Sequence, residues 1–310
     1  MTPLRLLVGF DGSAPSGRAV EQAGILAATL SARLTVLCVA ESLEEEADLP
    51  GRLARVRTLL RERGVAPVVL VRTGEAAAEL SATVREVGYD LVIVGGAGTW
   101  GGGLRLPATT WRVLRSVAPP VLVVKGERPA LRRILLATGG LWTEGLERAI
   151  PLVTGRIAAP AGAEVVLFSV VVPTPPMFAR EAGEETRAEG ILAGGSALGA
   201  HLRRAKRLAQ RAGVPVRVRV AAGDVVDSIL REAEAIDADL VVIGSAPPRG
   251  LVGFHVLGDV GREVLDAADR PVLILHTFES RPWGERWGRA LRRCGGKRDG
   301  SGHGKDAGLR

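Results

Sequence analysis

An acidic residue and a glycine-rich loop are the features of this sequence that could bind an anion or a small ligand. Asp11 directly follows an apolar segment, residues 6–10, and opens the turn Asp11-Gly12-Ser13. Residues 95–103 are rich in glycine, follow a second apolar segment and precede a predicted helix at 108–117. Glycines let backbone N–H groups approach phosphates, and the start of the following helix favours negative charge. Alternatively, Asp11 has a structural role, capping the first helix or shaping its turn.

The sequence motifs of other nucleotide sites, of serine hydrolases and of metal sites are incomplete or absent. Gly96, Gly98 and Gly101 match the dinucleotide fingerprint Gly-x-Gly-x-x-Gly, but the next strand ends in Lys125 instead of an acidic ribose partner, and the helix starts too late. The sequence has no Walker A motif and no serine nucleophile elbow. We therefore assign no catalytic residue and no metal site. Metal-ligand spacing is also absent from the four histidines, which are His201, His255, His276 and His303.

The sequence repeats itself once. Residues 5–8, 90–95 and 120–124 recur as 133–136, 239–244 and 271–275. A period this long is too large for a solenoid repeat and predicts two tandem domains, 1–126 and 130–277, joined by a short linker. In each half, apolar strands alternate with helices, so we predict an α/β fold with two doubly wound domains. The predicted strands are 6–10, 34–39, 67–72, 91–94, 121–124, 134–138, 164–172, 216–220, 240–243 and 272–275, and helices are expected at 15–30, 49–62, 75–87 and 108–117.

Charge and composition narrow the class of protein. The chain has 310 residues and a net charge of +7, but residues 281–310 hold nine Lys or Arg against three Asp or Glu. The rest of the chain is nearly neutral, which argues against nucleic acid as a partner. No apolar run is long enough to span a membrane, the N-terminus lacks a signal peptide, and Cys38 and Cys294 do not form a disulfide framework. We expect a cytoplasmic protein.

Two groups of residues resemble the universal stress protein family. Residues 6–16 are similar to the family's opening strand and turn, and residues 91–95 and 113–124 are similar to its fourth strand and final helix–strand unit. Both halves resemble this domain, over roughly residues 4–276. The resemblance implies a five-stranded parallel sheet of order 3-2-1-4-5, like that of the adenine nucleotide alpha hydrolases, in each half. It also implies pairing of the fifth strands, 121–124 and 272–275, as a pseudo-dimer within one chain.

Many members of the family bind ATP, and the resemblance implies a site in the first half. The family signature after the fourth strand is Gly-x2-Gly-x9-Gly-Ser/Thr. Ala108 replaces its third glycine, and the loop is one residue short. The residues implied for the site are Asp11 as the acidic partner of adenine or ribose, Val39 in the base pocket, Gly95 and Gly98 in the loop, and Thr109 as the hydroxyl.

The second half departs further from the signature. Gly139 replaces the acidic residue, and Pro247 takes the second glycine position and removes an N–H donor. Asp259 stands where the hydroxyl should be, and its carboxylate would repel a phosphate. The sequence therefore predicts a second half without a nucleotide.

The basic tail, residues 278–310, is predicted to be largely disordered. Trp283, Trp287 and Leu291 share one helical face among arginines. They could contact an acidic membrane surface or a partner, but we favour a short helix that docks back onto the second domain.

Three functions remain open at the level of sequence. The leading hypothesis is a regulatory protein of the stress response that binds ATP or another adenine nucleotide. Mg²⁺ could bind together with the nucleotide phosphates. The alternative is a scaffold that binds no nucleotide, whose degenerate sites are relics and which acts through its surfaces or the tail. A homo-oligomer is compatible with either hypothesis. Slow ATP hydrolysis ranks third, because no general base or water-positioning residue is identifiable near the loop.

Overall fold

Within the described part of the chain, ten strands form one sheet that runs through both halves. The strands are β1 (Arg5–Phe10), β2 (Arg33–Ala40), β3 (Val68–Thr73), β4 (Leu91–Gly95), β5 (Val121–Val124), β6 (Arg133–Ala137), β7 (Glu164–Val171), β8 (Val216–Ala222), β9 (Leu240–Ser245) and β10 (Val272–His276). Their order is β3-β2-β1-β4-β5-β10-β9-β6-β7-β8. Each half therefore has the predicted order 3-2-1-4-5. All neighbours within a half are parallel, which confirms the predicted α/β class.

This computed structural model describes residues 2–96, 106–128, 130–139, 144–171, 188–245 and 258–276. Pro3–Phe278 make up one compact unit. The expectations for Gly98, for Pro247 and for the tail fall outside the described residues. No helix within the described ranges is long and apolar enough to cross a membrane.

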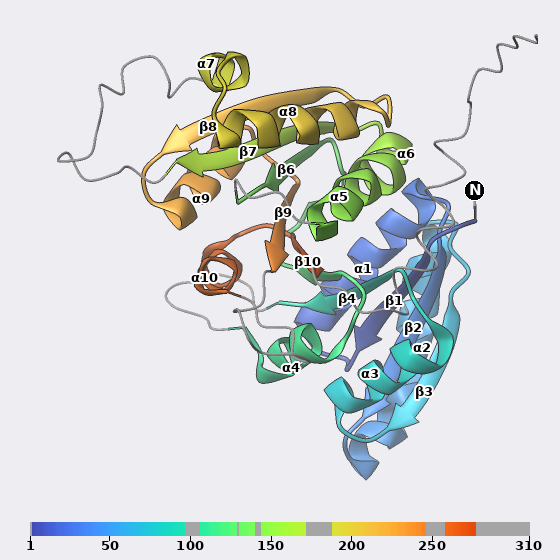
Figure 1. Ribbon diagram of the computed structural model, residues 1–310. Coiled ribbons are helices and arrows are strands. Elements are labelled where there is room, and N and C mark those ends of the chain that lie inside the picture. Colours follow the sequence, from blue (N-terminus) through green and yellow to red (C-terminus); the bar gives the residue numbers. More distant parts are fainter. Residues whose placement is uncertain are drawn as a thin grey trace, which may run out of the picture. The chain divides into compact units, whose positions relative to one another are not determined.

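Helices cover both faces of the sheet (Figure 1). In the first half, α1 (Ala14–Thr29) packs with α2 (Leu43–Glu62), and α3 (Ala76–Val87) packs with α4 (Ala108–Ser116). In the second half, α5 (Glu144–Pro151) packs with α8 (Ala197–Gln210), and α9 (Val225–Ala235) packs with α10 (Asp259–Ala267). The short helix α7 (Ala188–Ala193) precedes α8. The strands between these layers are apolar along their length because both of their faces are buried.

The halves join edge to edge through their fifth strands. β5 and β10 pair antiparallel, with Leu122 opposite Leu273, as the resemblance implied. Because this arrangement keeps equivalent helices on the same face, one core continues across the junction. It includes Val113 and Val123 from the first half and Val264 and Val272 from the second, all fully buried.

Two elements differ from the sequence prediction. Helix α2 begins at Leu43, not at residue 49, and Pro50 lies inside it. Between β6 and β7 the chain forms α5, then a π-helix over Leu152–Ala158, then α6 (Ala159–Ala161). Within this stretch the Thr154 hydroxyl donates to the Ile150 carbonyl at 2.8 Å. Such side-chain bonding to a preceding carbonyl bends helices, and apolar periodicity does not reveal it.

Candidate functional site

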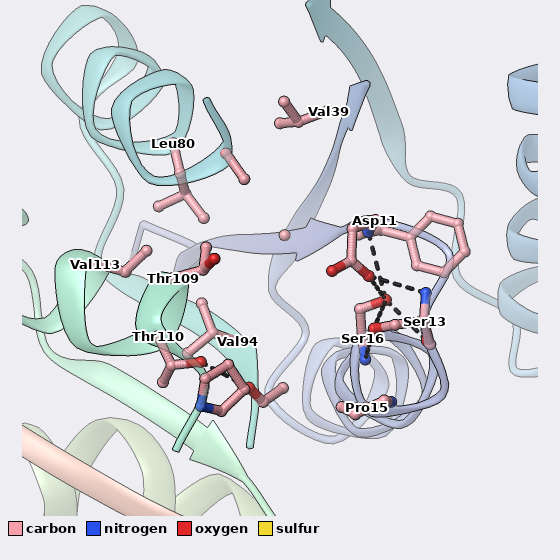
Figure 2. Close-up of a pocket in the computed structure, with 15 residues that line it drawn as sticks. Asp11, Ser13, Pro15, Ser16, Val39, Leu80, Val94, Thr109, Thr110 and Val113 are labelled. Atoms are coloured by element: carbon pink, nitrogen blue, oxygen red, sulfur yellow. Dashed lines mark hydrogen bonds between the residues drawn. The ribbon is translucent and has the colours of Figure 1, made fainter. Parts of the chain in front are cut away.

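A cavity opens at the carboxyl edge of the first half, where the strand order reverses beside β1. Open α/β sheets bind their ligands at this point. Asp11, Val39, Gly95 and Thr109 all line it, together with the starts of α1, α3 and α4. Figure 2 shows Asp11 and Thr109 on opposite sides of the space. Four of the five site residues expected from the sequence thus lie around one cavity, and Gly98 is outside the described residues.

Asp11 is held by the turn that it opens. Its Oδ1 accepts hydrogen bonds from the Ser16 hydroxyl at 2.6 Å and from the Ser13 amide at 2.9 Å (Figure 2). The Ser13 hydroxyl in turn accepts from the Ser16 amide at 3.3 Å and caps α1. Within the described residues, Oδ2 of Asp11 has no donor. The carboxylate therefore shapes its turn through Oδ1, as the structural alternative predicted.

The charge state of Asp11 follows from these contacts. Desolvation raises the pKa of its carboxyl group, but the hydrogen bonds from Ser13 and Ser16 together outweigh that effect. The pKa of Asp11 is therefore below the ordinary aspartate value, because hydrogen bonds to a carboxylate favour its ionised form. The group is an anionic acceptor at neutral pH.

Gly95 has a packing role that the sequence did not reveal. A Cβ atom there would lie 2.5 Å from the backbone carbonyl carbon and oxygen of Pro15, and 2.8 Å from the Ser16 nitrogen. Only glycine lets the end of β4 approach the first turn of α1 this closely. The carbonyl oxygen of Gly95 also accepts a hydrogen bond from the buried Thr110 hydroxyl at 3.0 Å. Sequence reasoning missed Thr110, which ties the start of α4 to the end of β4.

The helix termini around the cavity differ in how they are capped. Ser13 caps α1, and Glu75 caps α3 by accepting from the amides of Ala77 and Ala78. Glu41 accepts a further hydrogen bond from the Ala76 amide at 2.9 Å. By contrast, α4 starts after Pro107 and has no side-chain cap. Unsatisfied N–H groups at a helix start attract anions, so the α4 end of the cavity suits a negatively charged group.

Much of the cavity lining is apolar. Val39, Leu80, Val94 and Val113 are all buried and line the cavity (Figure 2). The enclosed cavity has a volume of about 110 Å³, below the roughly 300–1,000 Å³ typical of small-molecule sites. It can hold a ring-sized part of a ligand, and a larger ligand would extend beyond it.

Among the described residues, the carboxyl edge of the second half lacks the equivalent chemistry. Gly139 is exposed at the position of Asp11, and Asp224 caps α9. Helix α10 follows Gly258 without a side-chain cap, but its first residue is Asp259. That carboxylate already compensates the positive end of the helix. Among the described residues of both halves, no group of three or more His, Cys, Asp or Glu is placed to hold a metal ion.

Comparisons with known proteins agree with this architecture. The model of the universal stress protein family matches residues 4–125 and 131–276. A universal stress protein from Archaeoglobus fulgidus is 20% identical with a TM-score of 0.70, covering 88% of this chain and 98% of its own. A functionally unknown protein from Pseudomonas aeruginosa PAO1 is 22% identical with a TM-score of 0.64, covering 94% and 98%. Comparison with curated protein sequences gives no match.

A similar fold is found in a domain of a transporter. The cytoplasmic domain of a prokaryotic cation chloride cotransporter is 14% identical with a TM-score of 0.54, and the match covers 92% of this chain and 100% of that one. At such identities the likeness establishes the fold alone. The family match spans most of the sequence, however, and the chain belongs to the universal stress protein family, with two tandem domains.

Proposed function

We propose that the first half binds ATP or another adenine nucleotide, and that the protein acts as a regulatory member of the stress response. The observation that carries this proposal is the single cavity that joins Asp11, the apolar wall at Val39 and the uncapped start of α4 with Thr109. An acceptor, an apolar slot and an anion-binding helix end are the three features that a nucleoside phosphate requires.

The charges around the cavity favour one orientation of the nucleotide. The amides at the start of α3 already donate to the carboxylates of Glu41 and Glu75, and Glu75 is also paired with Arg112 at 3.0 Å, so this helix end has fewer free donors for a phosphate than α4. The base would lie against Val39, the ribose hydroxyls would donate to Oδ2 of Asp11, and the phosphates would lie at the start of α4. The Thr109 hydroxyl is in the first turn of that helix and is exposed. Mg²⁺ would arrive with the phosphates.

Calorimetric titration with ATP and Mg²⁺ tests the proposal. The wild type should bind, and Asp11→Ala should weaken binding at least tenfold, because a hydrogen bond to a charged group contributes roughly 1.5–3 kcal/mol. Asp259→Ala is the matched control, since it removes an exposed aspartate from the second half and should leave the affinity unchanged. If neither the wild type nor the variants release heat, a scaffold without nucleotide is the better description. Release of inorganic phosphate would instead support slow hydrolysis.

A further inference from the structure

An arginine from α2 reaches over the turn that carries Asp11. Nη1 of Arg52 donates to the backbone carbonyl oxygen of Asp11 at 2.6 Å, although the two residues are far apart in the chain. Nε of the same side chain donates to Asp48 at 2.9 Å, one turn earlier on α2. The guanidinium is thus oriented by a partner on its own helix and bonded to the end of β1. Planar guanidinium groups are well suited to such fixed geometry.

The next residue in the turn is shaped to receive this guanidinium. Gly12 has φ +83°, which other residues rarely adopt, and a Cβ atom on it would lie 2.8 Å from Cζ, Nε and Nη1 of Arg52. The guanidinium therefore lies directly against the backbone of the turn. Any side chain at position 12 would displace it, so Gly12 and Arg52 form one structural unit.

Helix α2, which carries Arg52, also packs against the neighbouring strand β2. The Arg52 side chain is only 21% exposed. Burial raises the pKa of the Cys38 thiol to about 11, and the charge of Arg52 acts against that rise. Cys38 immediately precedes Val39 of the cavity wall. Helix α2 thus contacts both the turn that carries Asp11 and the strand that carries Val39.

The equivalent position in the second half carries a different residue. His201 lies as many residues before Gly213 as Arg52 lies before Gly64, and these two glycines follow the equivalent helices. His201 is buried in α8, and the equivalent of Asp11 is Gly139. The arginine is therefore present in the half that has the aspartate and absent from the half that lacks it.

We infer that Arg52 is a positioning residue of the nucleotide site, holding the backbone of Asp11 from outside the cavity so that Oδ2 stays directed at the ligand. This inference rests on the proposed function. Arg52 does not line the cavity, and Ser13 and Ser16 fix the carboxylate from the other side. The side chain acts through Asp11 and not on the ligand.

Titration of the full chain with ATP and Mg²⁺ separates this role from general stability. Arg52→Met should raise Kd about tenfold, the change expected when one charged hydrogen bond is lost. Arg55→Met, an exposed arginine on the same helix, is the control and should match the wild type in Kd. Arg52→Lys, which can still donate to the carbonyl oxygen, should recover part of the affinity. In an Asp11→Asn background, Arg52→Met should have little further effect, because coupled residues are not additive.

Two results would overturn the inference. An unchanged Kd in Arg52→Met would show that the turn holds without the guanidinium. Fully additive losses in the double variant would place Arg52 on the ligand itself.

A measurement without ligand separates this inference from the proposed function. Amide hydrogen exchange at Gly12 and Ser13 should be faster in Arg52→Met than in Arg55→Met. If the wild type fails to bind the nucleotide, the proposed function falls, and the exchange result still decides whether Arg52 holds the turn. Equal exchange in the two variants contradicts the inference.

Discussion

At the scale of residues, the candidate site depends on short contacts between backbone segments as much as on side chains that face a ligand. Asp11 is ionised and oriented by two serines of its own turn. Gly95 allows the end of β4 to touch α1, and Gly12 allows Arg52 to lie against the turn. Both glycines are required by packing, whatever ligand the cavity takes.

Gly95 provides a direct test of this packing argument. Gly95→Ala should destabilise the fold by about 1–3 kcal/mol, because the new Cβ meets backbone atoms of Pro15 that cannot easily move. Gly17→Ala is the control within α1. Nothing lies within 4 Å of its Cβ position, so the higher helix propensity of alanine should stabilise by up to ~1 kcal/mol. Urea denaturation measures both, and a neutral Gly95→Ala would contradict the argument.

The sequence predicted part of this site and missed the rest for physical reasons. Asp11 follows one apolar strand and Val39 lies near the end of the next, so their placement at one sheet edge follows from parallel topology. Thr110 and Arg52 act on backbone carbonyl oxygens of residues distant in the chain. No local pattern marks a side chain that bonds to a distant carbonyl, and its role emerges only from the packed structure.

At the scale of elements, a buried lysine joins the end of β5 to the end of α10. Lys125 is 1% exposed, and its Nζ donates to the carbonyl oxygens of Leu265 at 2.6 Å and Asp266 at 3.1 Å. Its stem packs against Gly96, where a Cβ would lie 2.7 Å from the lysine Cγ. A cation at the last turn of a helix is favoured by the helix dipole. Lys125 thereby links Gly96, which follows β4 in the first half, to helix α10 in the second half.

Lys125→Ala should destabilise the protein by about 2–4 kcal/mol, because it leaves a cavity and two carbonyl oxygens without their donor. Lys125→Met should be more stable than Lys125→Ala, because methionine keeps the packing of the aliphatic stem but lacks the ammonium donor. Denaturant titrations of both variants beside the wild type measure the two contributions. Equal stability of Lys125→Ala and the wild type would contradict the role of this contact.

The same comparison predicts a pH dependence. Desolvation lowers the pKa of Lys125 below its ordinary value, partly opposed by Asp266 and Asp269. As pH rises above the folded pKa, the unfolded chain binds the proton and the folded chain does not, so folding gains stability. The free energy of unfolding of the wild type, relative to that of Lys125→Met, should therefore increase as pH rises towards the ordinary lysine pKa of about 10.4. A difference that shrinks with pH would contradict this sign.

At the scale of the whole molecule, the tandem domains share one sheet, and a buried apolar cluster on one of its faces runs through both halves. The duplicated strand motifs predicted two tandem α/β domains, and the resemblance to the universal stress protein family implied the strand order that each half has. The π-helix at Leu152–Ala158 and the long helix α2 were not predictable in this way. Pro50 lies inside α2 although proline normally disfavours a helix interior, and Thr154 of the π-helix bonds to the carbonyl oxygen of Ile150, which apolar periodicity does not reveal.

Because the core is continuous, the two halves should unfold together. Calorimetry should give a single transition with a van't Hoff enthalpy close to the calorimetric one. Val166→Ala, in the second-half core, should lower the free energy of unfolding by about 2 kcal/mol and move the whole transition to lower temperature. Val68→Ala, at a side chain that is 59% exposed, should leave the transition unchanged. A residual peak that keeps the wild-type midpoint would mean that the first half unfolds by itself.

The antiparallel union of β5 with β10 has an evolutionary consequence. When two identical separate chains pair through these strands, their association depends on concentration, and every substitution is present in both copies. A covalent tether makes the encounter intramolecular and independent of dilution. The first half can then keep the acidic residue Asp11 while the second half has Gly139 at the equivalent position. The second half still supplies β10, the strand with which β5 pairs.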